Sequence, residues 1–288
     1  APLGVRLPMS SFITKGSHLK SLGRQSLVSL QNCNNRPVIF YEYPFNERIR
    51  TYLRLEHLYA RMDALAGRDA PVDHHFALST LFVIMDIAGR AELKTDVLKD
   101  LDKQKNALLP YRGNPAIDEA ALNQVIAELD QSFAGLSQTP GRVGGLLGEN
   151  NWLMSVRSRA SIPGGTCSFD LPAYYAWQHL EASVRQHDLK PWIEAVQPMH
   201  TAVTLLMRLV RESGSAQKMV ATAGHFQQYV QQGKPYQLVR IRLDDRLGVV
   251  PEMSVNRLLV TARFVNFSVT ERALQTPDDI SFELTLCH

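Results

Sequence analysis

The spacing of the apolar residues changes near Gly214, and this change constrains the fold more than any other feature of the sequence. From about residue 46 up to that point, apolar side chains recur every three or four residues, which is typical of amphipathic helices. Beyond it, apolar and polar residues alternate, which indicates half-buried strands. The alternation is clearest at 238–243, 256–264 and 280–286 and weaker at 218–223 and 225–230. A helical part followed by a sheet is therefore expected.

One strand is expected well before the others. The segment VIFYEY, residues 38–43, is rich in β-branched and aromatic side chains, and Pro44 ends it. Asn46 offers a side chain that can cap the helix that follows. Because no other strand is predicted near it in the sequence, we expect this strand to join the C-terminal sheet. Further helices are predicted at 75–89, 93–108, 118–133, 149–159, 172–180 and 198–213.

These patterns predict an α+β protein with a helical bundle domain and an antiparallel β-sheet or sandwich domain that includes the early N-terminal strand. The predicted boundaries are residues 38–44 for that strand, 45–214 for the α-helical domain and 215–288 for the β-domain. Residues 1–37 form a separate segment, because residues 1–41 contain no Asp or Glu while Arg, Lys and Ser are frequent. This composition predicts a flexible basic leader.

Composition excludes several classes of protein. Apolar residues make up 45% of the chain and charged residues 20%, which is ordinary for a globular protein. No apolar run approaches the roughly 18–20 residues of a membrane span. The formal net charge is only +3. Cys33, Cys167 and Cys287 lie far apart without a CxxC motif, which argues against a disulfide framework and a zinc site and favours a reducing cytosol.

The segment SIPGGTCSFDLP, residues 161–172, is the strongest candidate for a catalytic loop, but it lacks the residues that such a loop needs. No Lys-Ser or Lys-Thr pair follows its glycines, so it is not a phosphate-binding loop. Cys167 would need a histidine such as His179 or His200 beside it to act as a nucleophile. Adjacent histidines in the DHH motif at 73–75 chelate a metal poorly on a helix. We therefore predict no catalytic residue, no cofactor and no metal.

The physical interpretation of residues 161–172 is a corner between two helices. Pro163 disfavours helical angles at the residue before it, and the two glycines turn the chain. Ser168 or Asp170 is expected to cap the next helix, and Pro172 suits its first turn.

Positive charge gathers on particular faces of the predicted strands. Between residues 217 and 267, seven basic residues stand against three acidic ones. Alternation in two strands puts arginine pairs on the faces opposite the apolar ones, namely Arg240 with Arg242 and Arg257 with Arg263. On the first predicted helix, four basic residues spaced four, three and four apart share a face: Arg50, Arg54, His57 and Arg61.

Two interpretations of these faces remain open. Antiparallel sheets commonly have one solvated polar face, and the arginines can be part of such a face. They can also form a binding surface, which arginine favours over lysine because its planar fork pairs with carboxylates and peptide groups. One alternative function is therefore a nucleic-acid-binding protein that uses the arginine-rich sheet face, although interleaved aromatic residues are missing from it.

Three segments of the sequence resemble a known family. They are FYEYPFNERIRTYLRLEHL, KTDVLKDLDKQ and SVRSRASIPGGTCSFDLPAYYAW, and with them the chain resembles the ZapD family of Z-ring-associated bacterial cell-division proteins. The resemblance runs from about residue 38 to 288 and is most specific in the block around SIPGG. It implies a helical domain plus a β-domain in a cytoplasmic protein at the mid-cell division site. It also implies a homodimer that binds the C-terminal tail of FtsZ and bundles FtsZ filaments, without nucleic acid or membrane insertion.

The resemblance also implies a basic pocket for the FtsZ tail. Matching by motif puts family arginines on Arg90, Arg263 and Arg54. This sequence departs from the family at Leu259, where Arg257 can substitute, and at Trp152, where a basic residue is expected. The predicted tail-binding residues are Arg90, Arg263, Arg257, Arg240, Arg242, Arg54 and Arg50.

Overall fold

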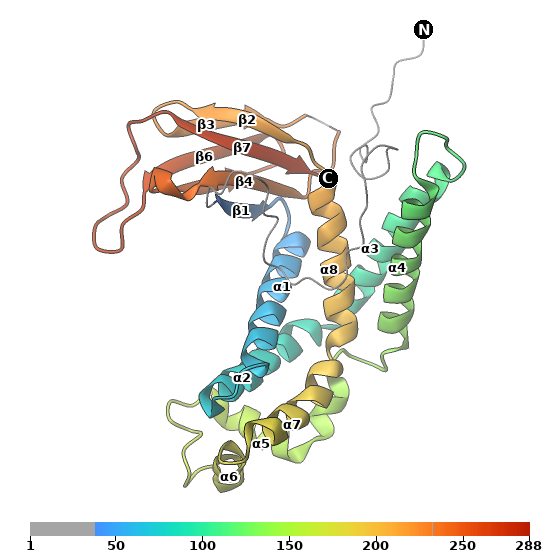
Figure 1. The fold of residues 1–288 in the computed structure, drawn as a ribbon, viewed down its shortest axis with the longest axis vertical. Helices are drawn as coiled ribbons and strands as arrows, with labels where there is room; N and C mark the ends of the chain where they lie inside the picture. Colours follow the sequence, from blue (N-terminus) through green and yellow to red (C-terminus); the bar gives the residue numbers. More distant parts are fainter. Residues whose placement is uncertain (1–37, 232) are drawn as a thin grey trace. The chain divides into compact units, whose positions relative to one another are not determined.

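The computed structural model describes residues 38–231 and 233–288, so the predicted leader at 1–37 lies outside the described residues. One strand precedes the helices and the other strands follow them (Figure 1). The helices are α1 Glu47–Ala66, α2 Pro71–Ala88, α3 Ala91–Leu108, α4 Glu119–Gln138, α5 Asn151–Ala160, α6 Pro172–Gln178, α7 Ala182–Glu194 and α8 Gln197–Glu212. The strands are β1 Val38–Pro44, β2 Ala216–Ala221, β3 His225–Tyr229, β4 Leu238–Asp244, β5 Val249–Val255, β6 Leu259–Asn266 and β7 Ile280–Cys287. The predicted α+β class is confirmed.

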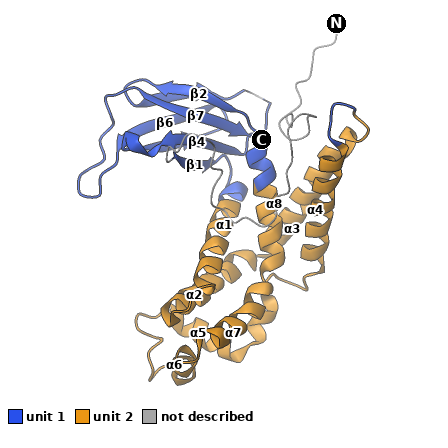
Figure 2. Cartoon of the chain, viewed as in Figure 1, with its two compact units in different colours: residues 1–50, 115–118, 208–288 blue, residues 51–114, 119–207 orange. Residues whose placement is uncertain are grey.

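The chain divides into two compact units (Figure 2). The β unit comprises the described residues up to Arg50, residues 115–118 and residues 208–288. The helical unit comprises residues 51–114 and 119–207. Helices α1 and α8 each contain residues of both units, because the unit boundaries fall within them.

The β unit is built from two antiparallel sheets that enclose a common apolar core. One sheet has the strand order β1-β4-β7-β2 and the other has the order β3-β6-β5. The early strand β1 joins a sheet of C-terminal strands, as predicted, and its partner is β4, with Tyr41 opposite Ile241. In the core, the ring of Phe282 lies 5.1 Å from that of Phe226 and 5.0 Å from that of Phe264, measured between centroids. Alternation along the strands therefore buries one face of each sheet against the other.

Two elements of the β unit differ from their predictions for local reasons. Strand β6 begins at Leu259 rather than at 256, because the side-chain oxygen of Asn256 accepts hydrogen bonds from the backbone N–H groups of Leu258 and Leu259, each at 2.9 Å, and turns the chain. Strand β5 was not predicted, since Pro251 argues against a strand. The structure accommodates the proline because β5 is an edge strand of its sheet.

The helical unit is organised around buried tyrosines of α1. The Tyr59 hydroxyl donates a hydrogen bond to the carbonyl oxygen of Val196 at 3.0 Å, and its ring stacks on His200 at 4.3 Å between centroids. Two turns earlier, the Tyr52 hydroxyl donates to the carboxylate of Asp100 on α3 at 2.8 Å. The start of α1 is capped as predicted, with the Ile49 N–H donating to the Asn46 side chain at 3.0 Å.

The SIPGG segment is a corner between α5 and α6, as predicted. Gly164 has a positive φ of 70°, and a Cβ on Gly165 would lie 2.7 Å from the Arg159 carbonyl oxygen, so both positions favour glycine. Across the corner, the Trp152 ring packs against Trp177 at 5.5 Å. The predicted cap is wrong: the residue before α6 is Leu171, whose side chain makes no capping hydrogen bond, while Pro172 occupies the first turn.

A buried arginine ties α7 to the segment before α2. Arg185 is 3% exposed and donates from Nε to Nδ1 of His74 at 2.9 Å, and it also donates to the carbonyl oxygens of Leu180 and Asp69. His74 is fully buried, and its other ring nitrogen lies 2.6 Å from the carbonyl oxygen of Arg68. Helix α7 was not predicted, because Arg185 and Leu189 are its buried residues and so little apolar periodicity is visible in the sequence.

A half-buried ion-pair cluster joins three elements of the β unit. The Glu42 carboxylate on β1 accepts hydrogen bonds from Arg211 of α8 at 2.8 Å and from Arg240 of β4 at 2.9 Å. Burial raises the pKa of Glu42, but the two guanidinium groups lower it by more, so this pKa lies below the usual value for glutamate. The carboxylate is therefore charged in the folded protein at neutral pH and satisfies two arginines at once.

We predict that Glu42→Gln lowers the free energy of unfolding by roughly 1–3 kcal/mol at pH 7, because two half-buried arginines lose their charged partner. The pKa of Glu42 is lower in the folded than in the unfolded protein, so its stabilisation is present above the unfolded pKa. The stabilisation is lost as pH falls through the folded pKa. Urea unfolding at several pH values should show the difference between variant and wild type shrinking on acidification.

Glu252→Gln is the matched control for this experiment. It removes the same charge from the ion pair between Glu252 and Arg263. In this pair the Glu252 side chain is 50% exposed and the Arg263 side chain is 53% exposed. Exposed pairs typically contribute below about 1 kcal/mol. Equal losses in the two variants would contradict the assigned role of the Glu42 cluster.

Candidate functional site

The strand arginines predicted to form one basic face lie on two different faces. Arg240 and Arg242 project from β4 on the side opposite the buried Val239 and Ile241. Arg263 projects from β6, which belongs to the other sheet. Since the apolar core lies between the two sheets, these outer faces point away from each other. The structure thus separates two of the arginine groups that the sequence suggested would act together.

Most of these arginines already have acidic partners. Arg240 pairs with Glu42 and lies over the Phe40 ring at 5.0 Å, while Arg242 pairs with Glu283 at 2.9 Å. Arg263 pairs with Glu252 of the neighbouring strand. Basic residues outnumber acidic ones between residues 217 and 267, but these ion pairs neutralise much of the positive charge.

The remaining predicted arginines have different surroundings. Arg257 is exposed in the turn before β6 and makes no side-chain hydrogen bond or ion pair within the described chain. Arg50 pairs with Glu47 at 3.0 Å and lies over the Tyr43 ring. Arg54 is exposed on α1 and Arg90 precedes α3, and both belong to the helical unit.

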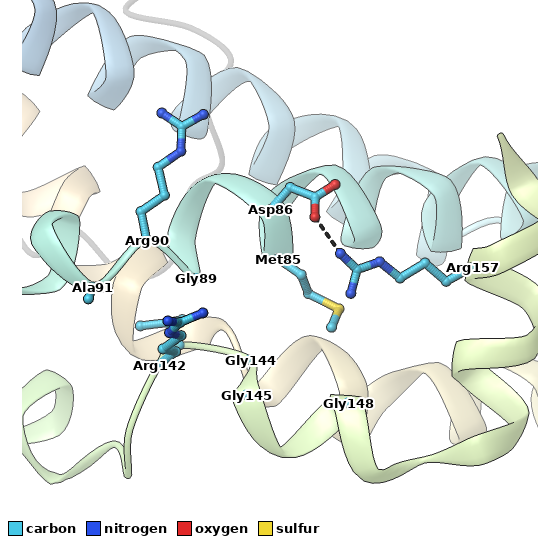
Figure 3. A pocket seen from close by; sticks show the side chains of 11 residues that line it. Met85, Asp86, Gly89, Arg90, Ala91, Arg142, Gly144, Gly145, Gly148 and Arg157 are labelled. Carbon is cyan, nitrogen blue, oxygen red and sulfur yellow. Dashed lines mark hydrogen bonds and ion pairs between the residues drawn. The ribbon is translucent and has the colours of Figure 1, made fainter.

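Arg90 lines a hollow of about 370 Å³ in the helical unit, which is within the usual size range of ligand pockets. Its wall is formed by the end of α2, the start of α3, the segment 142–148 and α5. Figure 3 shows Arg90 and Arg142 at one end of the hollow, Arg157 with Asp86 at the other, and Met85 between them. The lining contains three arginines and a single acidic residue.

The charges in this hollow are only partly compensated. Arg157 donates a hydrogen bond to the Asp86 carboxylate, so this pair is neutral overall. In the part of the chain that the structure describes, neither Arg90 nor Arg142 has a hydrogen bond or ion pair through its side chain. The hollow therefore carries an excess of positive charge, and Arg142 offers a free guanidinium group to an anion there.

A glycine-rich segment shapes the wall opposite α2. The sequence GRVGGLLG, residues 141–148, places Gly144, Gly145 and Gly148 on the hollow. Gly144 has a φ of 72°, and a Cβ there would lie 3.2 Å from Met85 Cγ and 3.3 Å from Val196 Cγ1. A Cβ on Gly148 would meet no atom within 4 Å. The segment thus combines one tightly fitted glycine with open space beside the guanidinium groups.

Arg142 and Arg157 were not among the residues predicted from the sequence. The sequence did contain a signal for a binding loop at Arg142. The segment 141–148 lies between two predicted helices and contains four glycines beside this arginine. Such a loop lets the main chain approach a ligand closely. Of the seven predicted residues, Arg90 lines this hollow. Four of the others were placed on predicted strands, where the period of two was easier to interpret.

The cysteine and histidines that the sequence analysis considered for catalysis or metal binding each contact another group of the protein. The Cys167 thiol lies 3.6 Å from the Asp170 carboxylate, whereas His179 contacts the Tyr175 carbonyl oxygen and His200 stacks on Tyr59. His75 Nδ1 lies 2.7 Å from the Tyr174 hydroxyl, and burial lowers the pKa of this histidine. Within residues 38–231 and 233–288, no group of three His, Cys, Asp or Glu side chains is arranged to hold a metal ion.

No helix in the described part of the chain combines the length and the apolar character that spanning a membrane would require.

Comparison with known proteins identifies the class of protein. A family model described as "ZapD: Cell division protein" matches residues 53–263. The chain is 50% identical over 252 residues to the cell division protein ZapD of Cupriavidus necator, and 49% identical over 252 residues to those of Cupriavidus metallidurans and Ralstonia nicotianae. Each match covers 87% of this chain and 100% of the relative.

These relatives are cell division proteins, and the match extends through both structural units. The chain belongs to the ZapD family. The resemblance recognised from the three sequence segments is confirmed.

We predict that Gly144→Ala destabilises the protein by about 1–3 kcal/mol, because alanine must adopt a left-handed backbone conformation while its Cβ presses on Met85 and Val196. Gly148→Ala is the control, since its added Cβ enters open space without a positive φ, and we expect a change within about 0.5 kcal/mol. Thermal unfolding followed by circular dichroism compares the two. Equal stability of both variants would contradict the tight packing described at Gly144.

Proposed function

We propose that this chain binds the C-terminal tail of FtsZ and, as a homodimer, cross-links and bundles FtsZ filaments, which stabilises the Z-ring. The observation that carries this proposal is the match over 252 residues to proteins named cell division protein ZapD. The protein acts in the cytoplasm at the mid-cell division site. It performs no catalytic step and needs no cofactor.

The binding is expected to be weak at each tail and strong along a filament. A short tail held by a few partly exposed arginines gains modest and salt-sensitive energy. A dimer that has bound one tail finds the next at a high effective concentration, so that its second contact is effectively intramolecular. The predicted tail-binding arginines, with Arg90 and Arg263 first among them, remain proposals. Arg90 has the geometric advantage that it lines a hollow and is unpaired within the described residues.

Nucleic-acid binding through an arginine-rich sheet face is the weaker alternative. Arg242 and Arg263 lie on outer faces of different sheets, and each has an acidic partner. A phosphate backbone is better matched by a continuous row of unpaired basic residues.

The experiment that tests the proposal is sedimentation of this protein with FtsZ of the same organism and GTP. It compares intact FtsZ with a version that lacks its last ~15 residues, the length of a short linear peptide that can fill one groove. We expect pelleting and bundling with intact FtsZ and their loss without the tail. Bundling that persists without the tail, or no interaction with FtsZ at all, contradicts the proposal.

Two arginine variants refine this experiment. We expect Arg90→Ala and Arg263→Glu to abolish bundling while circular dichroism shows folded protein. Unchanged bundling by a folded Arg263→Glu variant would remove Arg263 from the tail-binding surface. Arg112→Ala, which neutralises an exposed arginine of the helical unit outside the hollow, is the control for the loss of charge alone.

The proposed homodimer needs a surface that a second copy can cover, and α2 offers one. Most of its buried residues are apolar, and another part of its surface exposes Val72, Phe76 and Val83 at 55%, 52% and 41%. These residues are spaced four and seven apart and form one stripe, which is the spacing of a helix–helix seam. Exposed apolar residues that share one helix face are typical of a surface that another protein covers.

We predict that Phe76→Glu converts the dimer to a monomer in sedimentation velocity, because a carboxylate would be buried without a partner in the seam. Phe169→Glu is the matched control, since Phe169 is 83% exposed in the corner between α5 and α6, away from the stripe. A Phe76→Glu variant that remains dimeric at micromolar concentration would exclude the α2 stripe as the dimer surface.

A further inference from the structure

The hollow beside Arg142 has the chemistry of a binding site for a single carboxylate. The guanidinium of Arg142 reaches into it from the glycine-rich segment, and that of Arg157 reaches in from α5 (Figure 3). Because Arg142 has no side-chain partner among the described residues, an incoming anion need not displace any existing ion pair there. Arginine pairs with a carboxylate through two parallel hydrogen bonds, which fixes its orientation as well as its position.

The second arginine is held in place by an acid. Arg157 is paired with Asp86 and lies 3.9 Å from the Met154 sulfur, so its fork is oriented before a ligand arrives. Preorganisation of this kind lowers the entropy lost on binding. Arg90 extends from the rim away from Arg142 (Figure 3), where it adds to the positive potential at the mouth.

The remaining lining suits a peptide. Met85 and Val143 supply an apolar surface for the methylene groups of an acidic side chain. The glycines at 144, 145 and 148 leave the wall free of side chains, so that the main chain of a bound segment can lie close to it. The lining contains no aromatic residue on which a base can stack. Asp86 also repels a doubly charged phosphate more strongly than a carboxylate with a single charge.

We propose that this hollow binds an aspartate or glutamate side chain of an acidic peptide, with Arg142 as the principal partner of the carboxylate and Arg157 as a second donor positioned by Asp86. The inference rests on the proposed function, because the peptide that the protein would meet is a filament tail. It goes further in naming the residues, the chemical group they recognise and the location of that group in the helical unit.

The experiment measures fluorescence anisotropy of labelled peptides with the full-length protein. The probe is a synthetic peptide of the last ~15 residues of FtsZ from the same organism. A second peptide has every Asp and Glu replaced by Asn and Gln, and a third has an amidated C-terminus. Arg142→Met removes the charge but keeps an unbranched side chain, and Arg112→Met makes the same change at an exposed arginine outside the hollow.

We expect Arg142→Met to weaken binding of the native peptide about tenfold or more, the loss of one charge-assisted pair, and Arg112→Met to change it less than about twofold. Gly148→Leu, which fills open space in the hollow, should also weaken binding. The acid-free peptide should bind weakly and show no dependence on Arg142, while amidation should have little effect.

The outcomes separate this inference from the proposed function. If the native peptide binds the wild-type protein and Arg142→Met binds it equally well, the carboxylate site is overturned and the proposed function stands. If amidation alone abolishes binding, the ligand is a terminal carboxylate and the side-chain assignment is overturned. If the peptide does not bind the wild-type protein and FtsZ does not co-sediment with it, both proposals fail.

Discussion

The pairing of β1 with β4 is the constraint on which the rest of the structure depends. Val38 lies opposite Asp244, so residues separated by about 200 positions must meet before this sheet is complete. The chain has to leave the sheet through α1, form the helical unit and return through α8. The Glu42 cluster lies at this closure, where it joins the first strand to β4 and to the end of α8. Long-range pairing of this kind is slow to form, because loop closure costs entropy before the contacts are made.

Charge pairing separates the arginines that maintain the fold from those that are available for binding. Arg211, Arg240 and Arg242 contact carboxylates of the β unit, and Arg185 is buried among carbonyl oxygens in the helical unit. By contrast, Arg142 reaches a hollow with its charge uncompensated within the described chain. The same residue type therefore stabilises the fold at some positions and is left available to a ligand at another, and the difference lies in whether a carboxylate has been placed beside it.

Much of the fold could be predicted from the sequence, because burial of alternate residues leaves a regular pattern. Strands β4 and β7, the early strand β1 and the long helices followed from that pattern. Strand β5 did not, since Pro251 is compatible with a strand only at a sheet edge, and edges are set by tertiary structure. Arg240, Arg242 and Arg263 were predicted on the correct side of their strands, whereas Arg257 lies in the turn before β6. That β4 and β6 belong to different sheets is a matter of long-range pairing, which a periodicity cannot reveal.

Pro251 also has a consequence for how copies of this protein behave when crowded. An exposed sheet edge presents a row of backbone donors and acceptors that can pair with the edge of another molecule and begin aggregation. Proline has no N–H group, so it interrupts that row in β5, and a foreign strand cannot form a continuous ladder along it. Copies held at high local concentration are therefore less prone to join through this edge.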